Sequence, residues 1–318
     1  MTKKYILGSI LFVLTALVIL VGVWCYSRYR QEANVRGKYT FSATKDKINY
    51  LGNIKISTPS GGEFNIHRSS DGSWRFKEAK DYYVNEEMLA SFFRLVKNSV
   101  IVSVLPLNEK FLQQNNLTEE SGIKVETYDY DGKLLDKLVL GKLVPEQQLI
   151  MVRNSENEHY AYAASAVNSF SSLPQDWIPY PLLNIKTSEI KSVIINNKKR
   201  DYNEFNNLLM HSSVWRDLAG VLNFMEYQGL TYKSDLADLP PDVKVRQIDV
   251  LMLTGMFYKL TVLNVNDTYW VLISMDAQKV FTKDAINVAA NTYRFYADWI
   301  FQLMDKQGEI LFNEALLD

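Results

Sequence analysis

The side chains that most often carry enzyme chemistry are few and scattered in this sequence. His67, His159 and His211 stand far apart, and none has a companion ligand at the spacing of a zinc site. The motifs G-x-x-x-x-G-K-[ST], G-x-S-x-G and H-E-x-x-H do not occur, and they are common signatures of phosphate binding and hydrolysis. We therefore expect surface or packing roles for the three histidines, and no catalytic, cofactor-binding or metal-binding residue is predicted.

The run Asp129-Tyr130-Asp131-Gly132 is the one segment that resembles part of a calcium-binding loop. Such a loop needs a glutamate at its twelfth position, and this sequence lacks it. Asp-Gly between two alternating segments, residues 123–130 and 134–140, is a strong signal for a β-hairpin turn. The run is therefore predicted to turn the chain and not to hold an ion.

The overall composition is that of an ordinary globular protein, with 47% hydrophobic and 22% charged residues. Residues 1–40 hold six Lys+Arg and one Glu, so the remainder carries 29 Lys+Arg and 35 Asp+Glu, a net charge of −6. A mildly acidic domain without a basic run does not fit a nucleic-acid binder. Cys25 is the only cysteine, so no disulfide can form after it.

The first thirty residues are the most informative element. Tyr5–Tyr26 is a 22-residue stretch without a charge, and Lys3-Lys4 and Arg28 flank it. A helix that rises about 1.5 Å per residue crosses a hydrocarbon core of about 30 Å at this length. We predict a transmembrane anchor over residues 1–30 and a linker over residues 31–44, which together tether the rest of the chain to a membrane.

Two other interpretations of this stretch fit less well. A cleaved signal peptide has an apolar core of roughly 7–15 residues and small residues at the cleavage site, whereas this core is longer and ends in the bulky run Val23–Tyr26. Lipid attachment at Cys25 needs a small residue before it, and Trp24 occupies that position. The side of the membrane on which the C-terminal domain lies stays open. The flanking charges favour the cytoplasmic side, but long domains are translocated largely regardless of charge.

After the linker, the sequence predicts an α+β fold that is built twice. In the first half, a helix begins after Asn85, and alternating strands are expected at residues 53–57, 63–67, 73–76, 123–130, 134–140, 149–153 and 160–163. The second half repeats the pattern, with strands at residues 191–196, 243–253, 257–265 and 269–274, a helix over residues 218–225, and a closing helix over residues 285–297 that reaches Trp299.

Similar residues recur at offsets of 122 to 129 residues, and this favours an internal repeat. Leu89 corresponds to Leu218, Gly132 to Gly255, Val139-Leu140 to Val262-Leu263, and Trp177 to Trp299. A repeat this long indicates two subdomains, since solenoid units span roughly 20–50 residues. The prediction is a transmembrane helix followed by two tandem, similar subdomains, residues 45–180 and 181–318, each a mostly antiparallel sheet with one or two packed helices. Three prolines mark the seam Leu173–Pro181.

Several of these residues together resemble a bacterial family that is known only as domain of unknown function 4340. The resemblance rests on Asp71-Gly-Ser-Trp74, on Asp81–Asn85 before the first helix, on Asp131-Gly132-Lys133 and Leu138–Lys142, on Tyr160 and Tyr162, and on the closing Trp299–Leu303. It covers about residues 45–303. The chain departs from the pattern at Phe111–Leu117, where many members carry a glycine before the leucine, and the second half is more degenerate.

This resemblance implies a single-pass protein of the bacterial inner membrane with an extracytoplasmic domain. Family members often accompany ABC-transporter auxiliary proteins of the type linked to gliding motility. The implied role is that of an accessory component in a transport or envelope complex, with protein partners in the membrane.

Three hypotheses for the function follow. The first is a non-catalytic accessory or scaffold protein whose partner surface lies on loops or near Trp177–Pro181. The second is an extracytoplasmic binding module for a polymer or peptide, which a pocket lined by aromatic residues would favour. The third is a hydrolase with a site assembled from scattered carboxylates, which buried carboxylates with shifted pKa values in a cleft would favour.

Overall fold

The computed structural model describes residues 2–155, 161–165, 171–236, 243–277 and 292–317; within the first helix, side chains are described at residues 14–27, 29–30 and 33–35. The chain is mixed α+β and divides into two compact units. One comprises Met1–Trp74 and Glu86–Trp177, and the other comprises Arg75–Asn85 and Ile178–Asp318. The boundary between Trp177 and Ile178 lies within the seam expected at Leu173–Pro181. The sequence placed Arg75–Asn85 in the first half, whereas the structure groups it with the second unit.

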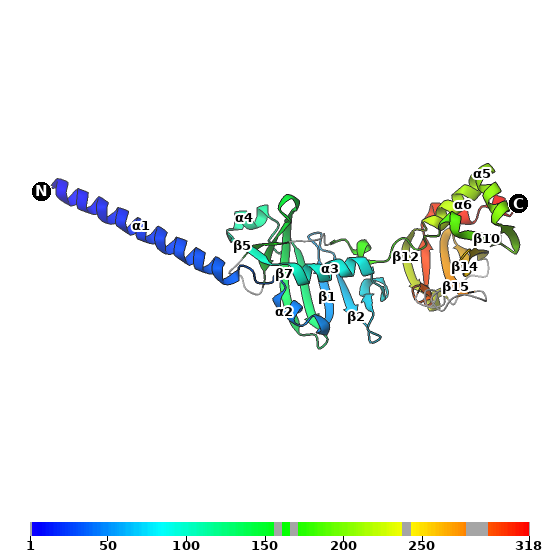
Figure 1. Cartoon of the computed structure of the whole chain (residues 1–318), viewed down its shortest axis with the longest axis horizontal. Coiled ribbons are helices and arrows are strands. Elements are labelled where there is room, and N and C mark those ends of the chain that lie inside the picture. The colour runs from blue at the N-terminus through cyan, green and yellow to red at the C-terminus, as the bar shows by residue number, and fades with distance from the viewer. Residues whose placement is uncertain (1, 156–160, 166–170, 237–242, 278–291, 318) are drawn as a thin grey trace. The chain divides into compact units, whose positions relative to one another are not determined.

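The chain begins with one long helix, α1 (Thr2–Val35), drawn in blue in Figure 1. Its large apolar side chains between Leu14 and Tyr26 are exposed, with Val18 at 70% and Leu20 at 66%. Among the described residues, no helix is both long and apolar enough to cross a membrane.

The segment predicted as a linker, residues 31–44, is largely structured. Helix α1 continues to Val35, and a short helix, α2 (Ser42–Asp46), begins before the predicted end of the linker. Phe41 is buried and its ring meets that of Phe92 edge-on at a centroid distance of 6.0 Å. Residues 31–44 are mostly polar, and this composition favoured a linker. Phe41 nevertheless packs into the core and fixes the segment to the first unit.

The first sheet has nine strands in the order β4-β3-β2-β1-β6-β7-β8-β9-β5, and every pairing described within it is antiparallel. Its strands are β1 (Leu51–Ser57), β2 (Glu63–Arg68), β3 (Trp74–Phe76), β4 (Tyr82–Tyr83), β5 (Ile101–Leu105), β6 (Ile123–Asp129), β7 (Leu134–Val144), β8 (Leu149–Asn154) and β9 (Ala161–Ser165). Alternation is clear in β1, where Ile54 and Ile56 are buried and Lys55 between them is not.

Helix α3 (Glu86–Asn98) lies across the first sheet, as Figure 1 shows. Glu86 and Glu87 occupy its first turn, where carboxylates favour the positive end of the helix dipole. Its buried side chains follow helical spacing, and Phe92 meets the buried ring of Trp177 at 6.2 Å. The apolar stripe read from the sequence is therefore the face that packs. A shorter helix, α4 (Glu109–Gln114), is capped by the side chain of Asn108.

The second sheet has seven strands in the order β11-β10-β13-β14-β15-β16-β12, again with antiparallel pairings. These strands are β10 (Ile190–Ile195), β11 (Lys198–Asp201), β12 (Tyr227–Tyr232), β13 (Lys244–Met252), β14 (Met256–Val265), β15 (Thr268–Ala277) and β16 (Trp299–Leu303).

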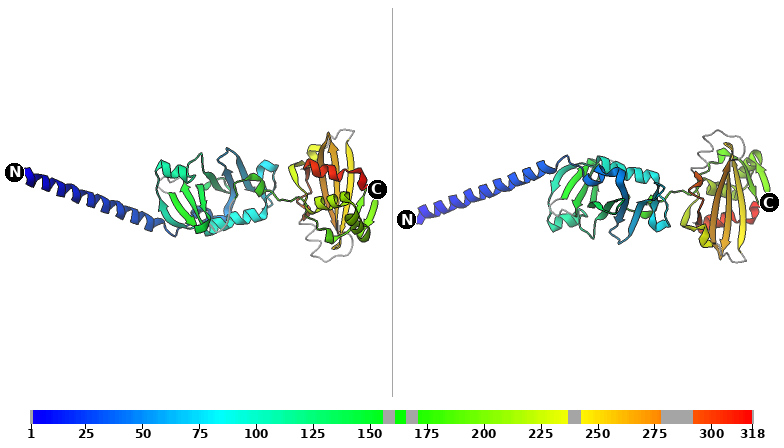
Figure 2. Two further views of the ribbon diagram at one scale, coloured as in Figure 1. Left: turned by 90° about the horizontal axis from the view of Figure 1, so that it is seen from above. Right: turned by 90° about the horizontal axis from the view of Figure 1, so that it is seen from below.

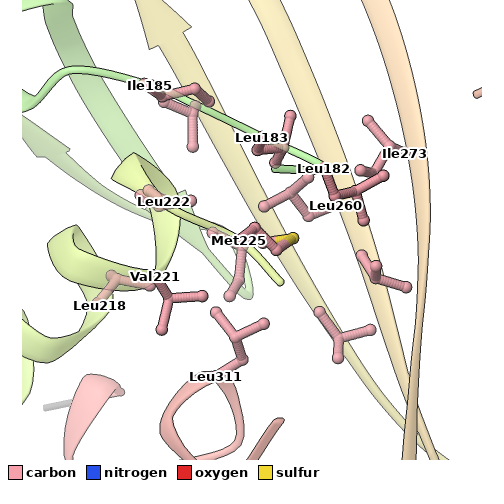
Figure 3. Close-up of a cluster of buried hydrophobic side chains, with 14 of the residues drawn as sticks. Leu182, Leu183, Ile185, Leu218, Val221, Leu222, Met225, Leu260, Ile273 and Leu311 are labelled. Carbon is pink, nitrogen blue, oxygen red and sulfur yellow. The ribbon is translucent and has the colours of Figure 1, made fainter. Parts of the chain in front are cut away.

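Among the described residues, the second unit includes the helices α5 (Tyr202–His211), α6 (Ser213–Asn223) and α8 (Asp305–Leu311). The left view of Figure 2 shows α8, in red, over the orange strands of the sheet. Figure 3 shows Leu218 and Leu222 of α6 among the side chains of the core, with Leu260 from β14 and Leu311 from α8. The hydrophobic positions expected at Leu218, Val221 and Leu222 thus form the packed face of α6. The helix ends at Asn223, before the predicted end, and Met225 is buried beyond it.

The two sheets share one strand order. Without β3 and β4, the first reads β2-β1-β6-β7-β8-β9-β5, and the second reads β11-β10-β13-β14-β15-β16-β12. When the strands of each half are renumbered along the chain, both orders become 2-1-4-5-6-7-3. In both halves the principal helices lie between the second and third strands of that numbering.

Three of the four predicted residue correspondences fall on matching elements. Leu89 and Leu218 lie on helices α3 and α6, and Gly132 and Gly255 lie in the turns of the β6–β7 and β13–β14 hairpins. Residues 139–140 and 262–263 lie in β7 and β14. The correspondence of Trp177 with Trp299 is wrong, because Trp177 ends a 3₁₀ turn and Trp299 begins β16.

The predicted closing helix over residues 285–297 is only partly within the described residues. Residues 292–293 are helical and 294–298 form a turn, while the rest of the predicted helix lies outside the description. Trp299 lies in a strand, where it pairs with Tyr232. An apolar aromatic run such as Trp299-Ile-Phe suits a buried strand as well as a helix, so periodicity over a few residues did not separate the two.

Candidate functional site

The structure does not bring the histidines together. His67 lies on β2 in the first unit, His211 ends α5 in the second, and His159 is outside the described residues. Within the described part of the chain, no three His, Cys, Asp or Glu side chains gather in a way that could hold a metal ion.

The acidic run Asp129–Gly132 forms the β6–β7 turn, so the hairpin prediction is confirmed. The Oδ1 atom of Asp129 accepts hydrogen bonds from the backbone N–H groups of Asp131 at 3.1 Å and Lys133 at 2.9 Å. Gly132 adopts a φ of +76°, a conformation that glycine tolerates far better than other residues. Asp129 therefore organises the turn through its side chain.

Glu126 on β6 is a carboxylate with two charged or polar partners. Its carboxylate lies 3.0 Å from the Lys137 ammonium and accepts a hydrogen bond from the Tyr128 hydroxyl at 2.8 Å. Burial acts to raise the pKa of Glu126, but the hydrogen bonds from Tyr128 and Lys137 outweigh it and lower that pKa. Burial and the bond to Glu126 raise the pKa of Tyr128 to about 12. A carboxyl group held in its ionised form is poorly suited to act as a general acid.

A buried carboxylate, Asp136 on β7, has a structural role. It accepts hydrogen bonds from the backbone N–H of Thr44 at 2.7 Å and from the Thr44 hydroxyl at 2.6 Å. The Thr44 hydroxyl also lies 2.6 Å from that of Thr127 on β6. These bonds attach α2 to the sheet, and they satisfy the polar atoms that burial would otherwise leave without partners.

An aromatic and arginine cluster occupies the second unit. The Arg75 guanidinium lies 3.6 Å from the centre of the Tyr83 ring and 5.7 Å from that of Trp299, and Arg294 lies 5.3 Å from the Tyr83 ring. Tyr82 is buried, with its ring 5.1 Å from that of Trp299, and burial raises its pKa well above the ordinary value. The cluster holds Arg75–Asn85 within the second unit, which explains why the structure assigns that segment there.

The seam near Trp177–Pro181 contains both buried and exposed aromatic residues. Trp177 is fully buried and its Nε1–H donates to the Ser171 carbonyl at 2.9 Å, so it is part of the core and is not a contact residue. Tyr180 is 50% exposed, its hydroxyl donates to the Glu226 carboxylate, and its ring meets that of Phe224 at 5.4 Å. Tyr180 and Phe224 together form an exposed aromatic pair of the second unit.

A depression of about 230 Å³ lies in the first unit beside the β6–β7 turn. Its lining consists of Lys47, Tyr50, Asp129, Tyr130 and Asp131. Tyr50 is 65% exposed and Tyr130 is 52% exposed. We call this feature the tyrosine depression. Sequence reasoning identified the turn but not the depression, because Tyr50 and Tyr130 are distant in sequence and no pattern connects them.

Comparison with family models, with curated proteins and with solved structures finds no match to this chain. The resemblance to domain of unknown function 4340 consequently rests on the residue patterns alone.

Proposed function

We propose that this protein is a non-catalytic accessory or scaffold protein, held at the bacterial inner membrane by α1 with the remainder on the extracytoplasmic side. The observation that carries the proposal is the segment Tyr5–Tyr26, which has no charge and forms part of a continuous 34-residue helix. Exposed apolar side chains from Leu14 to Tyr26 are costly in water and favourable in lipid. The resemblance described above supports the assignment to an ABC-type transport or envelope complex.

The polar groups that the structure describes also support a role without catalysis. Glu126, Asp129 and Asp136 each stabilise a sheet, a turn or a helix attachment. The hydrogen bonds that Glu126 accepts lower its pKa, so this carboxyl is held in its ionised form. A hydrolase with two carboxylates requires one of them to stay protonated near neutral pH, which calls for a raised pKa.

We further propose that the two halves arose as an internal repeat of one α+β subdomain. Their common strand order supports this, since seven strands can be arranged in a sheet in many ways and both halves use the same arrangement. Arg75–Asn85, with part of β3 and all of β4, is then an addition to the first copy.

For the protein partner, we propose the exposed pair Tyr180 and Phe224 as the contact surface. Aromatic side chains dominate binding energy at interfaces, and hydrogen bonds hold this pair in place. A photoreactive benzoylphenylalanine at Phe224 of the full-length protein should crosslink to one discrete membrane protein. The same residue at Tyr202, an exposed position on α5, is the matched control and should not crosslink to that protein.

Tyr180→Ala should reduce the yield of that crosslink without changing the melting temperature. Equal yields from positions 224 and 202 would contradict the proposed surface. Turnover by the purified protein, abolished by one carboxylate substitution that leaves the fold intact, would contradict the non-catalytic role itself.

A further inference from the structure

We propose that the tyrosine depression is a binding site for a neutral saccharide unit. Outside α1, Tyr50 and Tyr130 are the two most exposed aromatic side chains among the described residues. Both line the same depression, so the two most exposed aromatic side chains of this set lie together. Exposed aromatic surface that is gathered in this way commonly marks a binding site.

The backbone beneath the two tyrosines is fixed before any ligand arrives. The Tyr130 N–H donates to the Tyr50 carbonyl at 3.1 Å, and the Tyr50 N–H donates to the Lys47 carbonyl at 2.8 Å. A Cβ atom at Gly52 would lie 2.9 Å from the carbonyl oxygen of Asp129 and from the backbone of Tyr130, so only glycine permits this close approach. A rigid platform loses little conformational entropy on binding.

The charges at the depression favour a neutral ligand. The Lys47 ammonium lies 3.7 Å from Asp129, and the Arg68 guanidinium lies 5.6 Å from the centre of the Tyr130 ring. These two cations balance Asp129 and Asp131. A cationic ligand would meet Lys47 in the lining and Arg68 beside the Tyr130 ring, and an anionic ligand would meet the two carboxylates of the lining. Neither a cationic nor an anionic ligand is therefore attracted by the net charge around the depression.

A pyranose ring suits this combination of groups. Its faces carry C–H groups that pack on aromatic rings, while its hydroxyl groups accept from ammonium groups and donate to carboxylates. A volume of about 230 Å³ is below the roughly 300–1,000 Å³ of pockets for drug-sized molecules, which fits one sugar unit of a longer chain. The proposal goes beyond the accessory role and does not depend on membrane anchoring.

The test uses the full-length protein in a polyoxyethylene detergent, which contains no sugar. Chitotetraose and maltotetraose are titrated by calorimetry, and at least one should bind with a Kd of about 1 mM. Binding should change little between about 0.05 and 0.5 M NaCl, because screening affects charged ligands and not neutral ones. Tyr50→Ala and Tyr130→Ala should each weaken binding by about two- to tenfold.

Two control variants make the result specific. Tyr50→Phe keeps the aromatic ring and should retain most of the affinity, and Tyr202→Ala removes an exposed tyrosine of the second unit and should bind as the wild type does. Absence of saturation by both oligosaccharides overturns the proposal. Binding of hexalysine that disappears at high salt and in Asp131→Asn also overturns it, since that result assigns the depression to a basic peptide.

Discussion

At the scale of single residues, several buried polar side chains stabilise the fold through hydrogen bonds. Arg246 on β13 is the clearest case, with only 3% of its surface exposed. Its guanidinium donates to the carbonyls of Leu311 at 3.3 Å and Asn313 at 2.7 Å, and it lies 2.9 Å from the Glu314 carboxylate. It therefore fastens the C-terminal segment to the second sheet.

Replacing Arg246 should destabilise the second unit strongly. Arg246→Met removes the guanidinium bonds to two backbone carbonyls, although the Asn313 carbonyl keeps a second donor, the Leu316 N–H at 3.2 Å. The expected cost is about 2–4 kcal/mol in the free energy of unfolding. Urea denaturation measures the loss. Glu314→Gln is the control, since that side chain is 82% exposed and its ion pair contributes less than about 1 kcal/mol. Equal effects of the two substitutions would contradict the importance of the carbonyl bonds.

The raised pKa of Tyr128 predicts a loss of stability at alkaline pH. The folded state raises this pKa from 10.0 to about 12, so it favours the protonated phenol. That contribution is complete below pH 10.0 and disappears as the pH rises through about 12. In Tyr128→Phe, the free energy of unfolding should fall less steeply over this interval than in the wild type. Parallel pH profiles for the two proteins would contradict the assignment.

At the scale of elements, two helical glycines have opposite surroundings. A Cβ atom at Gly308 of α8 would lie 2.0 Å from the ring of Tyr269, whereas one at Gly220 of α6 would meet nothing within 4 Å. Gly308 therefore sets how closely α8 approaches β15. Gly220 is a position where glycine lowers the helix propensity without a packing benefit.

These two sites make a matched pair for mutagenesis. Gly308→Ala should destabilise the protein by about 1–3 kcal/mol because the helix must move away from Tyr269. Gly220→Ala should stabilise it by up to about 1 kcal/mol through helix propensity. Thermal unfolding of both variants measures the difference, and a melting temperature of Gly308→Ala at or above that of the wild type would show that α8 packs differently.

The sequence predicted elements well wherever local signals define them. The hairpins at Asp131-Gly132 and Thr254-Gly255 are present, because turn residues and alternation act over a few neighbours. The four edge strands β4, β5, β11 and β12 were not predicted. Of these, β5 and β12 pair with segments far along the chain, so no local signal marks them. In β12, Gly229 and polar neighbours also interrupt the alternation.

Single side chains were harder to place than elements. Trp74 is half-buried against Phe93, and Phe76 two residues later is the one in the core. Trp74 and Phe76 share one face of β3, so alternation along the strand does not tell which of the two is the more deeply buried. The tyrosine depression escaped prediction for a related reason, because it depends on the contact between η1 (Ile48–Tyr50) and a turn far along the chain.

At the scale of the whole molecule, our central claim is that α1 tethers a chain that works by contact. Residues 37–40 belong to the first unit rather than to the tether, since Gly37 donates to the Ile101 carbonyl at 2.8 Å and Thr40 donates to that of Ser99 at 2.9 Å. The tether should therefore be removable at Val35 without loss of the fold. A chain of residues 36–318 should be soluble and should unfold cooperatively.

Vesicle flotation tests this claim most directly. Full-length protein is reconstituted from detergent with vesicles of phosphatidylethanolamine and phosphatidylglycerol and is then centrifuged through a density gradient, alongside the chain of residues 36–318. We predict that the full-length protein floats with the lipid, also in high salt, and that the shortened chain stays at the bottom in folded form. Full-length protein that remains at the bottom, or a shortened chain that floats as well, would contradict the account of α1 as the membrane anchor.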